Sequence, residues 1–287
     1  ALMITVAASA EEFAGLVQEG TAVAGHRCGT HTPTALELER NALAVERWRS
    51  VHAVSLDKAL VTIPMAIHVI RMDDGTCDVT DAQIADQVAV LNEAYAGYGF
   101  QFTVAGVDRY DNSKWSTARY GSRQASLMKE STAIDPAHNF NVWFANIGGG
   151  LLGYATFPDM YPEDSPLHGV VALYSTVPGG TAYPYNEGDT LTHEAGHFLG
   201  LYHTFQGGCT GGDYVDDTEP EAEPAYGCPE GRDTCTGGDV DPIHNFMDYV
   251  DDYCMWEFTN GQAVRMNEQM SMYRPTMMDG SSGGVAP

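Results

Sequence analysis

Apolar and polar positions alternate with the period of β-strands at several places in the first two thirds of the chain. The run at 61–70, VTIPMAIHVI, predicts a strand, and further strands are predicted at 100–110 and 140–147. The segment at 148–158 opens with three glycines and is expected to form an edge strand, while the run at 169–176 is expected to close the sheet. Together these segments predict one β-sheet in the N-terminal part of the protein.

Three stretches have the apolar spacing of amphipathic helices. The strongest is 80–96, where Thr80 or Asp81 can cap the first turn, and the others are 34–48 and 259–273. Strands and helices interleave up to about position 200, and the sequence from there to the last helix is rich in glycine, proline and aspartate. This order predicts an α+β fold with a regular first lobe and an irregular second lobe.

The composition limits the partners of the protein. The chain has 287 residues, and its 39 acidic and 14 basic side chains give a net charge of -25. This charge argues against nucleic acid or an anionic membrane surface as a partner and favours cationic ligands. No stretch of about 20 consecutive apolar residues occurs, so the sequence predicts no membrane-spanning helix.

The N-terminus contains a short apolar run, LMITVAA at 2–8, followed by Ala8, Ser9 and Ala10. These small residues resemble the site where a secretion signal is removed, although no basic residue precedes the run. A strand of an N-terminal pro-segment would have the same pattern. Both interpretations stay open from the sequence.

The clearest chemical signal is the sequence HEAGHFLGLYH, which runs from His193 to His203. His193 and His197 are four residues apart, so they lie on one face of a helix and can reach one metal ion. Gly200 can adopt a left-handed conformation that ends the helix, and the chain can then return so that His203 approaches the same ion. Three protein ligands of this kind predict a catalytic zinc site with its fourth position open to water.

Glu194 directly follows the first of these histidines. From there its carboxylate can lie beside a metal-bound water and act as a general base. The alternative is a buried helix that holds its histidines by chance, because Leu191, Ala195 and Phe198 would serve as ordinary core residues. The extended pattern HExxHxxGxxH fixes a glycine and a third histidine as well, and therefore favours the zinc site.

Four cysteines lie in the loop-rich region after this motif: Cys209, Cys228, Cys235 and Cys254. They are 19, 7 and 19 residues apart and include no CxxC pair, which argues against a second zinc site and for two disulfide bonds. The spacing allows three pairings and does not choose among them. Disulfide bonds predict an oxidising, extracellular location.

A second motif lies downstream, in HNFMDYVDDYC. It contains Met247 and Tyr249 and resembles the Met-turn of the metzincin metallopeptidases, in which a methionine lies beneath the three histidines. Met247 is therefore expected to be structural, since a thioether there would fill the gap below the imidazoles and exclude water. The phenol of Tyr249 could donate a hydrogen bond to the oxyanion of the tetrahedral intermediate. Plain core packing is the alternative for both residues.

From about Ile63 to Tyr273 the sequence resembles the small secreted type of the pappalysin family of metzincins. Besides the two motifs, the segments that carry the resemblance are GGGLLGYATFP, GDYVDDTEP, YGCPEGRDTC and HNFMDYVDDYCMWEFTNGQ, together with the cysteine spacing. The resemblance implies a mixed twisted sheet with backing and active-site helices and a smaller irregular C-terminal lobe, with the substrate extended across a cleft between the two lobes. It also implies the disulfide pairs Cys209–Cys235 and Cys228–Cys254.

With this resemblance the chain divides into four parts. These are an N-terminal extension or pro-segment at 1–55, an N-terminal catalytic lobe at 56–200, a C-terminal catalytic lobe with the Met-turn at 201–275, and a flexible tail at 276–287.

The resemblance also implies where a substrate binds. A peptide is expected to pair with the edge strand around Leu151, Gly153 and Ala155, so that alternate side chains enter pockets. Asp252 stands five residues after Met247, like the aspartate that lines the pocket beyond the scissile bond in small bacterial members of the family. A carboxylate there would favour Arg or Lys. The alternative is an ordinary solvated acid of the loop.

The loop GGDYVDDT at 211–218 resembles a calcium site of the family. Oxygen ligands from Asp213, Asp217 and Thr218, completed by main-chain carbonyls, suit the six to eight ligands that calcium prefers. Such a calcium ion would have a stabilising role. A solvated acidic loop without an ion is the alternative.

Cys28, in the sequence RCGT, has two competing interpretations. One resembles the cysteine switch of metzincin zymogens, in which a pro-segment thiolate occupies the fourth zinc position. The other is a disulfide bond between Cys28 and Cys77, which the even number of cysteines favours. The RCGT context, in the extension that precedes the catalytic lobe, favours the switch.

The sequence thus predicts a secreted zinc endopeptidase, with zinc and calcium as its cofactors, that acts on protein or peptide substrates. Glu194 would take the proton of the attacking water and pass it to the leaving amine. A latent zymogen is a further hypothesis, with Arg40, Arg47 and Arg49 as candidate cut sites. The alternative from another class is a non-catalytic binding protein of the same fold, and the retention of Glu194 argues against it.

Overall fold

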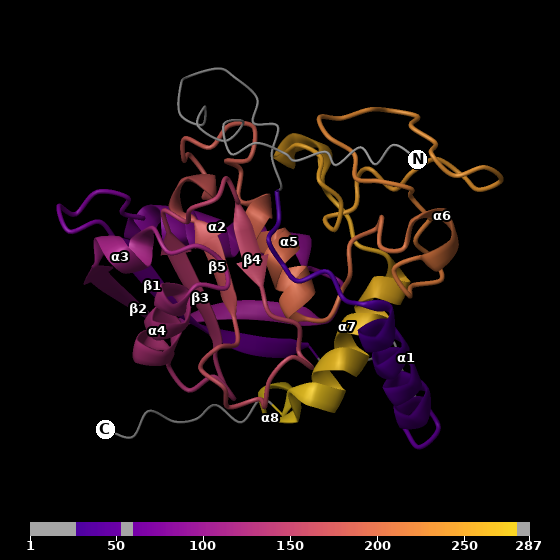
Figure 1. Ribbon diagram of the computed structural model, residues 1–287, viewed down its shortest axis with the longest axis horizontal. Coiled ribbons are helices and arrows are strands. Elements are labelled where there is room, and N and C mark those ends of the chain that lie inside the picture. Colours follow the sequence, from indigo (N-terminus) through magenta and orange to yellow (C-terminus); the bar gives the residue numbers. More distant parts are fainter. Residues whose placement is uncertain (1–26, 53–59, 280–287) are drawn as a thin grey trace, which may run out of the picture.

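A five-stranded sheet lies at the centre of the computed structural model (Figure 1). The structure describes residues 27–52 and 60–279. The apolar run at 2–8 and the small residues Ala8 to Ala10 lie outside the described residues. The strand order is β2-β1-β3-β5-β4. The strands are β1 (Val61–Arg71), β2 (Phe100–Asp111), β3 (Phe140–Ala145), β4 (Gly153–Ala155) and β5 (Val170–Leu173). Neighbouring strands are parallel except β4, which runs antiparallel to β5. The expected fold class, a mixed sheet combined with helices, is confirmed.

The helices begin where the sequence supplies caps. Thr34, Thr80 and Thr259 each form a capping box with the Glu or Gln three residues later. The helices are α1 (Ala35–Arg49), α2 (Asp81–Ala94), α3 (Ser113–Ser116), α4 (Arg123–Thr132), α5 (Asp189–Phe198), α6 (Gly208–Gly211), α7 (Asn260–Tyr273) and α8 (Pro275–Met278), with 3-10 turns η1 (Tyr174–Thr176) and η2 (Asp252–Cys254). The short α3, α4 and α6 are additions to the predicted elements, and α8 occupies positions assigned to a tail.

The sheet is covered on both faces, and the alternation of side chains along β3 shows how. Phe140, Val142 and Phe144 are buried in the larger core, which also contains residues of α2 and α5. Trp143 and Ala145 belong to a second core with Met128 of α4. Because successive side chains of a strand point to opposite faces, one short apolar strand serves both cores.

The edge of the sheet is formed by the segment that the sequence predicted. β4 lies within 148–158, which was expected to form an edge strand, and it is the last strand of the sheet. β5, from the run at 169–176 that was expected to close the sheet, lies between β3 and this edge strand. Val170, Val171 and Ala172 are all fully buried, which suits an interior strand. The edge is therefore formed by the short β4, which lies next to the active-site helix α5.

The second lobe contains little regular structure and is held by other means. It contains the disulfide bonds Cys209–Cys235 and Cys228–Cys254, the two pairs that the resemblance implies. The partly buried Arg232 guanidinium forms ion pairs with the buried carboxylates of Glu221 and Asp241. Within the described residues, no helix is both long enough and apolar enough to cross a membrane.

Helix α1 lies alongside α7 (Figure 1), although the two are far apart in the sequence. The amide groups of Asn41 and Gln269 donate hydrogen bonds to each other at 3.0 Å. Arg49 makes a two-pronged contact with the Glu268 carboxylate, at 2.7 and 2.8 Å. The N-terminal extension is therefore attached to the catalytic lobes at a second place, remote from Cys28.

Candidate active site

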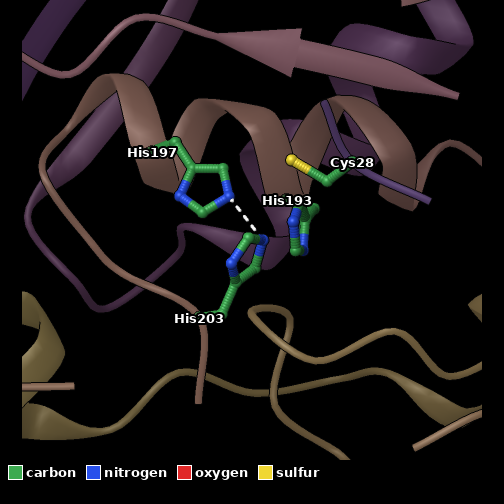
Figure 2. Close-up of side chains that lie close together, drawn as sticks. All are labelled: Cys28, His193, His197 and His203. Atoms are coloured by element: carbon green, nitrogen blue, oxygen red, sulfur yellow. Dashed lines mark hydrogen bonds between the residues drawn. The ribbon is translucent and has the colours of Figure 1, made fainter. Parts of the chain in front are cut away.

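The three histidines of the motif converge because of the way α5 ends. His193 and His197 lie one turn apart on α5, and Gly200 then adopts a left-handed conformation, with φ of +105°. A Cβ at Gly200 would lie 2.5 Å from the Gln269 side chain, so glycine is required here for space as well as conformation. Figure 2 shows His203 approaching the other two imidazoles from the chain beyond the helix.

Backbone carbonyls orient two of these rings. The Nδ1 atom of His193 donates to the Phe246 carbonyl at 2.7 Å, and Nδ1 of His197 donates to the Leu201 carbonyl at 2.8 Å. In a neutral imidazole the other nitrogen then carries the lone pair. The Nε2 atoms of His197 and His203 are 3.0 Å apart. The lone pairs are therefore directed to one place.

The surroundings keep the imidazoles neutral. Burial lowers the pKa of His197 to about 4, and it lowers the pKa values of His193 and His203 well below their usual range, with help from the neighbouring imidazoles. Nε2 of His193 is buried and has no hydrogen-bond partner among the described residues. An unpaired buried nitrogen is costly, and a metal ion would satisfy it. The three residues therefore fit a zinc ion.

Cys28 completes this group of donors. Its Sγ atom and one nitrogen of each histidine all lie within 4.8 Å of one another. Figure 2 shows the four side chains close together. The side chain is buried and is not bonded to Cys77, which is also a free cysteine. Burial, followed by the nearby charge of Glu194, raises the pKa of the thiol well above its usual value. The geometry thus agrees with the cysteine switch and not with the alternative disulfide.

Glu194 lies between the helix and the edge strand. Its side chain packs against Gly153, where a Cβ would approach the Glu194 Cγ atom to 2.7 Å. The carboxylate is 1% exposed, and burial raises its pKa to about 7. The Thr30 hydroxyl lies 2.8 Å from Oε2. Glu194 is thus beside the metal-donor cluster but outside it, as a general base requires.

Met247 and Tyr249, the residues of the predicted Met-turn, lie close to α5 and the histidines. Met247 is completely buried, and a Cβ at Gly196 would come within 2.4 Å of its Sδ atom, so the thioether packs directly against α5. The Tyr249 ring lies 5.0 Å from the His203 ring, and its hydroxyl donates to the Cys28 carbonyl at 3.4 Å. Burial raises the pKa of Tyr249 far above its usual value, so the phenol stays a hydrogen-bond donor.

The edge of β4 is covered by the N-terminal extension. Cys28 pairs with Gly153 in a parallel bridge, where the Gly29 N–H donates to the Gly153 carbonyl at 2.8 Å. The Leu152 N–H donates to the Arg27 carbonyl at 3.1 Å. The backbone groups that were expected to pair with a substrate, around Leu151, Gly153 and Ala155, therefore pair with the chain's own residues 27–30.

The extension also places a basic side chain on Asp252. Arg27 Nη2 lies 3.0 Å from Asp252 Oδ1, and both side chains are almost completely buried. Arg27 Nη1 donates to the Val250 carbonyl, and the guanidinium lies over the Tyr185 ring at 4.9 Å. The other carboxylate oxygen of Asp252 accepts from the Glu187 N–H at 2.9 Å.

The loop predicted to bind calcium contains two kinds of acid. Asp213 is buried, and burial raises its pKa to about 7; its Oδ1 atom accepts from the Val215 N–H. Asp217 instead accepts hydrogen bonds from the Thr259 hydroxyl and the Gly261 N–H at the start of α7. The Thr218 hydroxyl is buried and has no partner among the described residues.

Three contributors to this site were absent from the sequence prediction: Arg27, Thr30 and Tyr185. Arg27 and Thr30 flank Cys28 and Gly29 in RCGT, so the motif itself was the available signal. Their partners Asp252 and Glu194 are 225 and 164 residues away, a distance over which sequence spacing says nothing. Nothing in the local sequence of Tyr185 marks it.

Three neutral imidazoles, a carboxylate beside them and a methionine beneath define a metallohydrolase of the metzincin class. The chain matches the Peptidase_M43 family, described as pregnancy-associated plasma protein-A, over residues 125–271. It is 43% identical over 223 residues to extracellular metalloprotease 1 of Coccidioides posadasii, covering 76% of this chain and 79% of that protein. It is 40% identical over 284 residues to an extracellular metalloprotease of Podospora anserina, covering 91% and 96%.

Solved structures agree. A promirolysin mutant of Tannerella forsythia superposes with a TM-score of 0.75 at 28% identity, covering 88% of this chain and 97% of that chain. Mature mirolysin in complex with a cleaved peptide gives a TM-score of 0.68 at 30% identity, covering 77% and 96%. The chain belongs to the pappalysin family, Peptidase_M43, and it is an extracellular zinc metalloendopeptidase.

Proposed function

We propose that this chain is the latent form of a zinc endopeptidase that cleaves proteins before arginine or lysine. The observation that carries this proposal is the position of Arg27, whose guanidinium is buried against Asp252 beside the metal-donor cluster. A basic side chain of a substrate would meet the same carboxylate, the Val250 carbonyl and the Tyr185 ring once residues 27–30 are removed.

Zinc held by His193, His197 and His203 would supply a Lewis acid that polarises the scissile carbonyl and acidifies a water molecule. Glu194 takes the proton of that water and later gives it to the leaving amine. Tyr249 already donates to a carbonyl group at this place, that of Cys28, and would donate to the substrate oxyanion in the same way.

Two features support latency. Residues 27–30 occupy the edge of β4, where the substrate backbone would pair. Cys28 Sγ lies among the histidine nitrogens, where it would exclude the attacking water. We expect a Cys28→Ala variant to activate faster than the wild-type chain. An unchanged activation rate would contradict the switch.

Specificity can be tested on the matured enzyme with a peptide library. We expect Arg or Lys to be enriched directly after the cut, and we expect Asp252→Asn to lower kcat/KM for such peptides by about 10- to 100-fold. Asp251→Asn is the matched control, since Asp251 is the neighbouring acid and is only partly buried. If Asp252→Asn and Asp251→Asn had the same ratio of kcat/KM for Arg peptides to kcat/KM for Leu peptides, the role of Asp252 would be contradicted.

Calcium binding at Asp213, Asp217 and Thr218 is a further part of the proposal. The buried Asp213 carboxylate and the unpartnered Thr218 hydroxyl support it, because both gain a partner when a cation binds. We expect EGTA to lower the Tm and added calcium, but not added zinc, to restore it. A Tm that EGTA leaves unchanged would contradict this assignment.

A further inference from the structure

Thr30 contacts three parts of the active site at once. Its N–H donates to Cys28 Sγ at 3.3 Å, and its hydroxyl lies 2.8 Å from both the Ala155 nitrogen and Glu194 Oε2. The residue is 6% exposed and Glu194 is 1% exposed. These bonds therefore form away from water, where each contributes most.

The direction of the bonds follows from the donor inventory. The Ala155 N–H can only donate, so the hydroxyl oxygen of Thr30 accepts from it. The one hydroxyl proton of Thr30 then remains, and an ionised Glu194 carboxylate can only accept. The Thr30 hydroxyl thus accepts a hydrogen bond from the edge strand and donates one to Glu194.

Two glycines allow this close arrangement. A Cβ at Gly153 would lie 2.9 Å from Glu194 Oε1, so a side chain there would push the carboxylate away. A Cβ at Gly29 would lie 2.5 Å from Leu151 Cδ1, so the Leu151 side chain would have to move to make room for it. The segment RCGT can therefore lie flat enough for its threonine to reach the base.

We propose that Thr30 is a second latch of the zymogen, which acts on the general base Glu194 independently of the thiol of Cys28. While Thr30 donates to Oε2, the carboxylate is engaged and the space beside it, which the attacking water would need, is filled. Release of the thiol alone would then leave the base masked. This inference rests on the latent state proposed above and goes beyond it, because it adds a latch that does not involve the metal.

Valine is the informative replacement for Thr30, since it keeps the shape but loses the hydroxyl. Serine keeps the hydroxyl and serves as the matched control. We expect the uncut full-length Thr30→Val chain to cleave a short Arg-containing peptide about tenfold or more faster than wild type, in both the Cys28 and the Cys28→Ser backgrounds. Thr30→Ser should stay close to wild type. Equal rates for the valine and serine variants would overturn the proposal.

A measurement on the metal-free full-length chain separates a latch on Glu194 from a general loosening of the extension. In a Cys77→Ser background, the rate at which Cys28 reacts with a thiol reagent reports opening of the segment. Thr30→Val should raise this rate by about tenfold when Glu194 is present and by a clearly smaller factor in Glu194→Ala. The same factor in both backgrounds would assign Thr30 a packing role only and overturn the proposal.

The two proposals can fail separately. Once the N-terminal extension has been cleaved off up to residue 52, the Thr30→Val and wild-type enzymes are the same polypeptide. If this matured enzyme, supplied with zinc, leaves a denatured protein uncut, the proposed function fails. The thiol-labelling comparison uses neither zinc nor a substrate and still tests the Thr30–Glu194 bond.

Discussion

On one side of the active site, α5 and β4 belong to a regular sheet-and-helix lobe with two apolar cores. On the other side, the loop from His244 to Phe258 carries Met247, Tyr249 and Asp252 with only a short 3-10 turn. The first side is held by repeating backbone hydrogen bonds, whereas the second is held by the Cys228–Cys254 disulfide bond and the buried Arg27–Asp252 ion pair. The proposed general base, Glu194, thus lies in a regular helix, whereas Asp252, the proposed specificity residue, lies in a loop with little regular structure.

The largest expected effect compares one catalytic residue from each side. In the matured enzyme, Glu194→Ala should lower kcat by about 10²- to 10⁴-fold because the general base is lost. Tyr249→Phe should lower it by about 10²-fold, the usual cost of one oxyanion donor. Steady-state kinetics with zinc content measured in parallel would check both. A Tyr249→Phe enzyme with wild-type kcat would restrict Tyr249 to packing.

Disulfide removal probes the irregular side. Both bonds join cysteines 26 residues apart, so loss of either should cost a similar loop entropy, about 3 kcal/mol. Cys254 is fully buried and packs in the main core, whereas Cys209 is exposed. We therefore expect the Cys228→Ala, Cys254→Ala pair to be more destabilising than the Cys209→Ala, Cys235→Ala pair. Denaturant unfolding measures this, and equal losses would show that burial adds nothing.

A buried lysine probes the regular side. Lys129 lies in the second core, donates to the carbonyls of Leu167 and Gly169, and has its pKa lowered to about 7 by burial. Below pH 7 Lys129 is charged in the folded state, and burying this charge lowers the free energy of unfolding. Between pH 7 and about 10 the lysine is neutral in the folded state but still protonated in the unfolded state, so the free energy of unfolding rises with pH. The stability of wild type relative to Lys129→Met should therefore rise by about 1–3 kcal/mol between pH 7 and 9.

Thermal or urea unfolding at several pH values would measure this change. Lys114→Met is the matched control, because Lys114 is exposed. We expect its stability difference from wild type to be independent of pH in the same range. A flat pH dependence for Lys129→Met as well would mean that the carbonyls and the nearby Trp143 and Tyr154 rings stabilise the charge fully.

The smallest expected effects compare two helix caps. Thr80→Ala removes a capping box of α2 on the regular side and should cost about 1 kcal/mol. Thr259→Ala removes the cap of α7 and also the hydrogen bond from Thr259 to Asp217. It should therefore cost more, by about 0.5–1.5 kcal/mol. Equal losses in the free energy of unfolding by urea would show that the hydrogen bond between Thr259 and Asp217 contributes nothing to stability.

Much of the fold could be predicted because it depends on neighbours in the sequence. The alternation in 61–70 and the apolar spacing in 80–96 predicted β1 and α2 to within a few residues. The segment 148–158 was also predicted as the edge strand, which β4 forms. The order of the other strands could not be predicted in this way. That β1 lies between β2 and β3 depends on how the whole sheet packs.

The residues of the candidate site also fall into two groups, those whose positions follow from local sequence spacing and those whose contacts depend on packing. The spacing of His193, His197 and Gly200 determines by itself that two imidazoles share a helix face and that the helix ends just after them. Helix geometry over a single turn suffices for that. The Asp217 carboxylate, in contrast, was predicted only as a calcium ligand, and its contacts with Thr259 and Gly261 depend on where α7 packs.

The class of chemistry follows from the sequence alone, because the spacing of the zinc motif is a property of a few consecutive residues. The contacts that control this chemistry depend on the tertiary structure. Arg27 meets Asp252, and Thr30 meets Glu194, because the N-terminal extension adds to the edge of β4 and crosses both lobes. Such contacts depend on how separate elements pack, and residue spacing along the chain carries no record of that packing.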